Sequence, residues 1–336
     1  MKILLTRLDR VGDLLLTTPA IASVRRSWPH AHVTLVCSRY NAAVVERSPD
    51  VDAVMSLAEY IKPAAFGRRF RGSCDIALAL APRLADFELV RATGAPLRAG
   101  YTYCGRYLAR ATARLFLTRL SVADADPARS ERDLQRLVRH EVEYILDVVR
   151  LAGGNHIERE LVLPIDDVDR HAVSHVPSDS IVLHLGERWF HEGSSFESVV
   201  ALIRELHRFE RPIVVTYGVD VLEHAAAVRA LGVADLVVGG LSFSQWAAVF
   251  EKSKLVITVD TGATHVASAM RRPTVVLFEH RYFHLSSQEW APYRVPAACL
   301  RKPASDGAAE LAASRESILT AVGQLLETEI PAQALS

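Results

Sequence analysis

Near the start of the chain, the residues most suited to chemistry are Gly12 and Asp13, which close the segment Arg-Leu-Asp-Arg-Val-Gly-Asp. This segment joins an apolar run to a helical pattern, which is where open α/β folds bind ligands. It lacks the Gly-x-Gly-x-x-Gly pattern of a dinucleotide site. Gly12 permits a tight turn and a close backbone approach. Asp13 has two interpretations: an N-cap that accepts backbone N–H groups, or a general base that takes a proton from an attacking hydroxyl.

A second such segment is Asp-Thr-Gly-Ala-Thr-His, which starts at Asp260 and follows another apolar run. Its small residues allow a helix to start at Gly262 with backbone N–H groups exposed, and such a helix N-terminus binds phosphate. The hydroxyls of Thr261 and Thr264 would add donors. His265 would lie in the first helical turn, either directed toward a diphosphate or packed as a structural or capping histidine.

Further polar residues follow other strand candidates. Gly186 ends the run His-Leu-Gly and is expected to join the same anion-binding floor. Asp220 and Glu223 follow the next strand, where an acidic residue can bind ribose hydroxyls or can simply face solvent at a helix start. Three Asp-x-Asp pairs, at 50/52, 124/126 and 167/169, are scattered in polar stretches, so metal-dependent chemistry is not expected.

An arginine-rich stretch contains no acidic residue between Glu88 and Asp124. Arg106, Arg110 and Arg114 recur every four residues, so a helix here would carry them as one cationic stripe. The alternative is an ordinary solvated helix face. Over the whole chain Lys+Arg and Asp+Glu are equal at 39 each, so net charge favours no particular partner, and nucleic acid is not expected as one.

These residues must be positioned by alternating strands and helices. Short apolar runs alternate with longer helical patterns, which is typical of βαβ units and a parallel sheet. The length of 336 residues predicts two domains, 1–160 and 180–336, joined by a connection over 161–179. The expected strands are 3–8, 33–37, 51–57, 76–80 and 98–101 in the first half, and 181–185, 212–217, 236–238, 255–259 and 274–278 in the second.

Composition and cysteine use fit an intracellular globular protein. Apolar residues make up 50% of the chain and charged residues 23%. The four cysteines are far apart and form no Cys-x-x-Cys pair, so neither a zinc site nor a disulfide framework is predicted. Charged residues interrupt the apolar start of the chain before a signal-peptide core or a membrane span could form. Cytoplasmic localisation is therefore expected, with any membrane contact peripheral.

Two runs resemble glycosyltransferase family 9, the bacterial lipopolysaccharide heptosyltransferases. They are Gly-Asp-Leu-Leu-Leu-Thr-Thr-Pro-Ala, starting at Gly12, and Asp-Thr-Gly-Ala-Thr-His-Val-Ala-Ser-Ala, starting at Asp260. The strand 273–278 and the Trp-Ala-Pro at Trp290 continue a resemblance that spans nearly the whole chain. It implies an α/β protein of the GT-B fold, with two Rossmann-like domains whose parallel sheets face a central cleft. The N-terminal domain would bind the acceptor and the C-terminal domain the donor, and the last helix could pack back on the N-terminal domain.

The resemblance also implies an activity. The expected enzyme is an inverting, metal-independent glycosyltransferase that moves a heptose-type sugar from an ADP-sugar to a hydroxyl of a lipopolysaccharide inner-core acceptor, with Asp13 as catalytic base. No tightly bound cofactor is implied. The donor-binding residues expected from motif and resemblance together are Gly186, Arg188, Glu223, Leu241, Asp260, Thr261, Gly262, Thr264 and His265. The residues expected to contact an anionic glycolipid acceptor at the inner membrane surface are Gly12, Arg106, Arg110 and Arg114.

One departure from the family pattern concerns the first strand of the C-terminal domain. Family members often carry a lysine and a Trp-Pro pair after it, whereas this chain has Glu-Arg-Trp-Phe-His from Glu187. Arg188 or His191 could supply the missing cation, which would stabilise charge on the departing sugar phosphate. Two alternatives therefore stay open: a family 9 enzyme that acts on a small-molecule or protein acceptor, and a non-catalytic module that binds nucleotide sugars.

Overall fold

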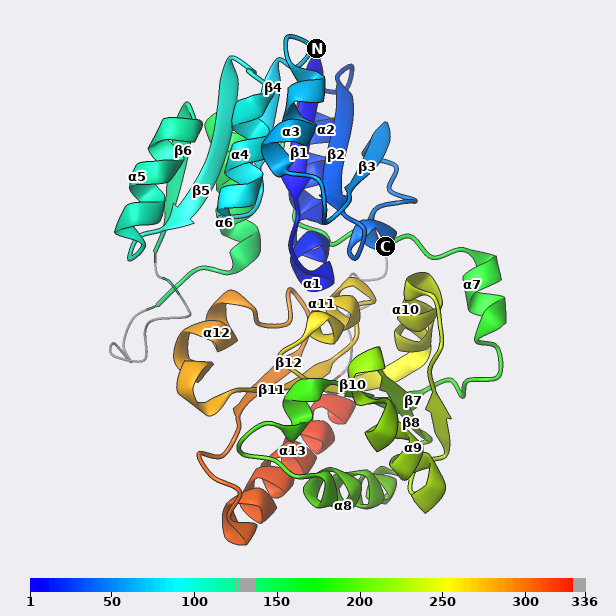
Figure 1. Cartoon of the computed structure of the whole chain (residues 1–336). Helices are drawn as coiled ribbons and strands as arrows, with labels where there is room; N and C mark the ends of the chain where they lie inside the picture. Colours follow the sequence, from blue (N-terminus) through cyan, green and yellow to red (C-terminus); the bar gives the residue numbers. More distant parts are fainter. Residues whose placement is uncertain (125, 127–136, 329–336) are drawn as a thin grey trace. The chain divides into compact units, whose positions relative to one another are not determined.

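The computed structural model describes residues 1–124, 126 and 137–328. The chain divides into two compact units, Met1–Pro164 and Ile165–Ser336. Each unit is built on a six-stranded sheet in which all strand pairs are parallel, with helices packed on the sheet (Figure 1). The division falls inside the stretch 161–179, where the sequence predicts the connection.

The N-terminal unit has the strand order β3-β2-β1-β4-β5-β6. Its strands are β1 (Lys2–Arg7), β2 (His32–Ser38), β3 (Ala53–Leu57), β4 (Ile76–Ala79), β5 (Leu97–Tyr103) and β6 (Arg119–Ala123). Its helices are α1 (Val11–Leu15), α2 (Thr18–Ser27), α3 (Pro63–Gly67), α4 (Leu84–Ala92), α5 (Tyr107–Phe116) and α6 (Glu141–Ala152). Strands β1 to β5 confirm the five strands that the sequence predicts in the first half. Strand β6, which falls in the arginine-rich stretch, was not predicted.

The central strand β1 explains the apolar run at the start of the chain. It pairs with β2 on one side and β4 on the other, and all its residues after Lys2 are buried, as expected for a parallel strand covered on both faces. On one face Phe66 of α3, Phe87 of α4 and Ala113 of α5 pack in one apolar cluster with Leu4. Helix α6 packs on the sheet against β4, β5 and β6, and it also packs against α2.

The C-terminal unit has the strand order β12-β11-β10-β7-β8-β9, which is the same winding as in the first unit. Its strands are β7 (Ser180–Leu185), β8 (Ile213–Tyr217), β9 (Leu236–Val238), β10 (Ser253–Val259), β11 (Thr274–Phe278) and β12 (Ala297–Arg301). Its helices are α7 (Asp167–Ala172), α8 (Phe196–Leu206), α9 (Leu222–Leu231), α10 (Phe243–Lys252), α11 (Gly262–Ala269), α12 (Phe283–Glu289) and α13 (Ala308–Glu327). Strand β12 is the one that the sequence did not predict.

The long helix α13 belongs to the C-terminal unit. Its residues Ile318, Leu319 and Val322 are buried in the same core cluster as Leu202 of α8 and Val275 of β11. The packing of the last helix on the N-terminal domain, which the resemblance implies, stays a prediction. Among the described residues, no helix is both long and apolar enough to cross a membrane.

The winding of each sheet fixes where a ligand can bind. In the first sheet the chain order reverses between the neighbours β1 and β4, and in the second between β7 and β10. Open α/β sheets bind ligands in the crevice outside the carboxyl ends of the strands at such a switch point. The loops that follow these four strands are therefore the places to look for a site.

Candidate active site

In the N-terminal unit the loop after β1 carries Asp13. Helix α1 begins at Val11 and its N-cap position is Arg10, so the interpretation of Asp13 as an N-cap is wrong. Asp13 lies in the first turn, and its side chain is 23% exposed. Its Oδ1 atom lies 3.5 Å from Nη2 of Arg7. The carboxylate is thus held beside a cation while part of it still faces solvent.

The cation beside it is fully enclosed. Arg7 ends β1 and its side chain is 2% exposed. Its Nε donates to Oδ1 of Asp9 at 2.8 Å, its two Nη atoms lie 3.3 Å from Oε1 of Glu141, and Nη1 also donates to the carbonyl of Leu80. Burial alone would lower the pKa of Arg7, but the neighbouring acids hold it well above its usual value. Arg7 therefore stays charged and joins the ends of β1 and β4 to the start of α6.

Two residues of this arrangement were missed by the sequence analysis. Glu141 begins α6 with a side chain 2% exposed, and its Oε1 accepts a hydrogen bond from the hydroxyl of Tyr101 in β5. Burial and the charge of Glu141 raise the pKa of Tyr101, so its hydroxyl keeps the proton. The available signal was Arg7 itself, because a charged side chain in a buried strand requires buried partners. Arg7, Asp9, Asp13, Tyr101 and Glu141 are called the Arg7 cluster below.

Burial raises the pKa of several acids around Arg7. It raises the pKa of Asp13, with Arg7 opposing the shift and Glu141 adding to it. It raises the pKa of Asp9 to about 6, against the effect of Arg7. It raises the pKa of Asp86, on α4, to about 7. A raised pKa makes a carboxylate a stronger base, which suits proton removal near neutral pH.

The loop between Arg7 and Asp9 is held by Asn41, another residue that the sequence analysis missed. Its side chain is fully buried, and its Nδ2 donates to the carbonyls of Arg7 and Asp9, each at 3.1 Å. Its Oδ1 accepts from the backbone N–H of Ser38 at 2.9 Å. Asn41 thus satisfies three buried backbone groups at once and fixes the approach to Asp13.

In the C-terminal unit the loop after β10 leads into α11. Thr261 is the N-cap of α11 and forms no side-chain cap bond, because its hydroxyl donates to the carbonyl of Val259 at 3.2 Å. Thr264 is fully buried, and its hydroxyl donates to the same carbonyl at 3.4 Å. The expected phosphate contact from the Thr264 hydroxyl is therefore wrong, since that hydroxyl closes the strand–helix turn. The backbone N–H groups at the start of α11 remain the anion-binding feature.

Arg188 reaches this helix start from the neighbouring loop. It lies in a short 3-10 helix, Glu187–Phe190, that follows β7. Its Nη1 donates to the carbonyl of Asp260 at 2.7 Å and also pairs with the Asp260 carboxylate. The two loops are adjacent, because a Cβ on Gly186 would lie 3.4 Å from Cγ2 of Thr261. Of the two expected cations, Arg188 is therefore the one beside Asp260.

His191 lies elsewhere, and a buried lysine supports the whole turn. Nδ1 of His191 is 3.4 Å from Oε1 of Glu279. Lys302 follows β12, and its Nζ donates to the carbonyl of Arg188 at 2.8 Å and to that of His191 at 3.3 Å. Burial lowers the pKa of this lysine. Lys302 was missed because β12, the strand that delivers it, was not predicted.

The other expected donor residues follow the carboxyl ends of β8, β9 and β10. Oδ2 of Asp220 accepts from the backbone N–H of Glu187 at 2.8 Å, so it ties the loops after β7 and β8 together. Glu223 is exposed in the first turn of α9, and Leu241 is half-buried just before α10. His265 is buried in α11. Both acids are exposed, but among the described contacts only the carboxylate of Asp220 holds a neighbouring loop.

The three arginines of the expected stripe do not act alike. Helix α5 begins after Arg106, which pairs with Asp126 through contacts of 2.7 and 2.9 Å. Nη1 of Arg110 lies 3.4 Å from the carbonyl of Cys104, and Arg114 is exposed. The expectation of one open cationic stripe is corrected, because an acid neutralises its first member.

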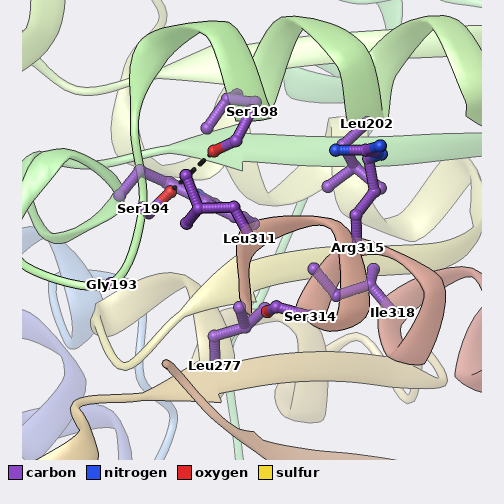
Figure 2. A pocket seen from close by; sticks show the side chains of 11 residues that line it. Gly193, Ser194, Ser198, Leu202, Leu277, Leu311, Ser314, Arg315 and Ile318 are labelled. Atoms are coloured by element: carbon purple, nitrogen blue, oxygen red, sulfur yellow. Dashed lines mark hydrogen bonds between the residues drawn. The ribbon is translucent and has the colours of Figure 1, made fainter. Parts of the chain in front are cut away.

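A pocket in the C-terminal unit is too small to be a substrate site. Figure 2 shows it between α8 and α13, with Ser194, Ser198, Leu311 and Arg315 around it. Its volume is about 20 Å³, which accommodates about one water molecule and no sugar. Ligand binding in this unit is therefore expected at the open loops after β7 and β10.

Two units with the same doubly wound sheet, each with polar loops at its switch point, define the GT-B class of glycosyltransferase fold. The family model described as Glycosyltransferase family 9 (heptosyltransferase) matches residues 197–316. The match to glycosyltransferase family 9 thus lies in the C-terminal unit, and the chain as a whole is distantly similar to members of that family.

Individual relatives are similar over most of their length. Lipopolysaccharide heptosyltransferase 3 of Escherichia coli is 22% identical over 298 residues, which cover 80% of each chain. A crystal structure of the family 9 glycosyltransferase from Veillonella parvula matches with a TM-score of 0.77 at 21% identity, covering 97% of both chains. Escherichia coli heptosyltransferase WaaC with ADP matches with a TM-score of 0.67 at 20% identity, covering 97% of this chain and 99% of that one.

Proposed function

We propose that the enzyme moves a heptose-type sugar from an ADP-sugar to a hydroxyl group of a lipopolysaccharide inner-core acceptor, with inversion at the anomeric carbon. The observation that carries this proposal is the partly exposed Asp13 carboxylate, held by Arg7 at the switch point of the first sheet. The donor class is supported by the relatives, because one is named a lipopolysaccharide heptosyltransferase and another was solved with ADP. Gly12 lets the acceptor approach the backbone beside this carboxylate.

In the proposed reaction Asp13 takes the proton of the acceptor hydroxyl as that oxygen attacks the anomeric carbon. The bond between this carbon and the diphosphate oxygen breaks on the opposite face, and ADP leaves. Arg188 and the N-terminal N–H groups of α11 stabilise the charge that develops on the diphosphate. Glu223 is proposed to bind the ribose and Leu241 to contact the adenine. Because a guanidinium and a helix N-terminus supply this stabilisation, no tightly bound metal is proposed.

The acceptor is proposed to be an anionic glycolipid at the inner face of the plasma membrane, with the enzyme in the cytoplasm or bound peripherally at that surface. Arg110 and Arg114 are the proposed contacts for its phosphate or carboxylate groups. Arg106 contributes less to this role, since Asp126 already neutralises it.

The test is nucleotide release from ADP-, GDP-, UDP- and dTDP-sugars, with and without a heptose-free core lipopolysaccharide acceptor and with and without a chelator. Acceptor-dependent release from ADP-heptose is expected, and Asp13→Asn should reduce kcat by roughly 10²–10⁴-fold. Asp167→Asn is the matched control, because that side chain is fully exposed on α7.

Other outcomes would redirect the proposal. Release only with a small-molecule or protein acceptor would change the acceptor class. Tight donor binding without release in any mixture would favour a non-catalytic binding module. Full activity of Asp13→Asn would refute the proposed base.

A further inference from the structure

The N-terminal unit contains a second group of arginines that the proposed reaction does not use. They line an open pocket of about 510 Å³. Its charged and aromatic lining residues are Arg68, Arg71, Glu88, Arg91, Arg98 and Phe116. Arg71 precedes β4 and Arg98 is the second residue of β5, so the pocket lies at the amino-terminal edge of the sheet. The Asp13 loop follows the carboxyl end of β1, which is the opposite edge of the same parallel sheet.

The positive charge of this pocket is not neutralised within the described part of the chain. None of its four arginines forms an ion pair there, and Glu88 is the one acid in the lining. Apart from Glu88, the lining comes from two segments without acidic residues, 60–74 and 89–123. Burial lowers the pKa of Arg98, and repulsion from Arg91 lowers it further. An anion placed in the pocket would relieve this repulsion.

Two of the four arginines, Arg91 and Arg98, are already held in position. Nε of Arg98 donates to the carbonyl of Phe116 at 2.9 Å, and its Nη1 donates to the carbonyl of Ala95. Nη1 of Arg91 donates to the carbonyl of Leu115, and its guanidinium lies 5.4 Å from the ring centroid of Phe116. Backbone contacts thus fix these side chains before any ligand arrives, which lowers the entropy cost of binding.

We propose that this pocket is a binding site for a phosphate monoester or diphosphate group. A guanidinium presents a planar fork of donors that matches phosphate oxygens, and arginine is preferred over lysine where such recognition matters. The volume is within the range of small-ligand sites. Arg91 and Arg98, which backbone carbonyls hold in place, form the preset part of the site, and exposed Arg68 and Arg71 complete it. The phosphate group bound here belongs either to a soluble molecule or to a lipid headgroup, because both carry the same phosphate chemistry.

The soluble arm of the test is calorimetric titration of the full-length protein with inorganic pyrophosphate at fixed ionic strength. Arg68→Ala/Arg71→Ala removes two exposed side chains without buried partners, so the fold should be kept, as circular dichroism would verify. The control is Arg204→Ala/Arg208→Ala, which removes the same charge from α8 and from the 3-10 helix His207–Phe209 that follows it in the other unit. We expect a binding component that the first variant weakens at least about tenfold and the control retains.

The lipid arm is co-sedimentation with phosphatidylcholine vesicles that contain phosphatidic acid, compared with phosphatidylcholine alone. Loss of sedimentation in Arg68→Ala/Arg71→Ala but not in the control would support the site and assign the phosphate to a lipid. Loss of the pyrophosphate component alone would support the site and assign a soluble ligand. Pyrophosphate and vesicle binding that are both absent, or both equal in the two variants, would overturn the proposal. Neither arm measures glycosyl transfer, so failure of the proposed function would not affect the result.

Discussion

At the scale of single residues, the main feature is one buried guanidinium surrounded by more acids than it can neutralise. Asp9, Asp13 and Glu141 all act on Arg7, and Asp86 adds a fourth acid that Arg7 also influences. Burial raises the pKa of Asp86 to about 7, so this acid holds its proton part of the time near neutral pH. Burial also raises the pKa of the partly exposed Asp13, with the charge of Glu141 adding to the shift, and this makes Asp13 a stronger base.

Asp86 allows a test of this protonation that is independent of catalysis. Burial raises its pKa from 3.8 to about 7, so the folded protein holds this proton more tightly than the unfolded chain. Its contribution to stability is therefore full below about pH 4, falls as the pH rises to about 7, and is constant above. Asp86→Asn mimics the neutral acid and can still accept from the Thr6 hydroxyl.

Denaturant unfolding of Asp86→Asn and wild type should therefore give similar free energies at about pH 4.5. At about pH 8 the variant should be more stable by roughly 2–4 kcal/mol. An equal difference at both pH values would show that Asp86 is ionised in the folded protein.

Glu141 is predicted to set the pH dependence of transfer. A base must be unprotonated, so kcat/KM falls as the pH falls through the pKa of Asp13. The charge of Glu141 raises that pKa, so Glu141→Gln should move the low-pH limb of the kcat/KM profile to lower pH. Glu143→Gln on the same helix is the control, because Glu143 pairs with Arg159 at the surface. An unchanged limb in Glu141→Gln, or the same shift in both variants, would contradict this role.

At the scale of elements, the sequence predicts the site residues whose position depends on a local pattern of neighbouring residues. Asp13 and Asp260 are found at strand–helix junctions because in both segments an apolar run is followed by a glycine and then by a helical pattern. Glu141 and Lys302 cannot be found this way, because each is defined by partners from distant segments. Strands β6 and β12 were missed because their sequences, Arg-Leu-Ser-Val-Ala and Ala-Ala-Cys-Leu-Arg, contain no continuous run of large apolar residues. The edge strands β3 and β9 do contain one and were predicted.

Lys302 is predicted to act on the donor through the turn that it supports. Lys302→Met keeps a long apolar side chain but leaves the carbonyls of Arg188 and His191 without their donor. The turn should loosen, and the KM for the nucleotide sugar should rise about tenfold, since a charged hydrogen bond contributes roughly 1.5–3 kcal/mol. Lys254→Met in β10 is the control. An equal rise in the acceptor KM would indicate a general loss of structure instead.

At the scale of the whole molecule, the chain repeats one construction. Both units have the same strand order, and each encloses its own apolar core. Helix α13 completes the core of the second unit through Ile318 and Val322. Everything needed to bury that core is therefore present in the segment that starts at Ile165.

A fragment from Ile165 to Ser336 is thus expected to fold by itself. It should unfold in a single cooperative thermal transition monitored by circular dichroism and, under the proposed function, bind ADP in a calorimetric titration. A broad, non-cooperative transition would show that the second unit depends on the first. Cooperative unfolding without ADP binding would leave the fold prediction intact and count against the proposed donor residues.

The central position of the first strand in each sheet has a consequence for protein synthesis. Ile3 pairs with both Val33 and Ile76, and Ile181 pairs with both Ile213 and Leu255. This central strand of each unit is translated before the other strands of its sheet, yet one of its edges stays uncovered until a partner some seventy residues later is translated. Contacts so distant in sequence form slowly, and an open apolar edge can pair with other chains. Nascent chains halted before β4 or before β10 should therefore be the forms of this protein that chaperones must bind.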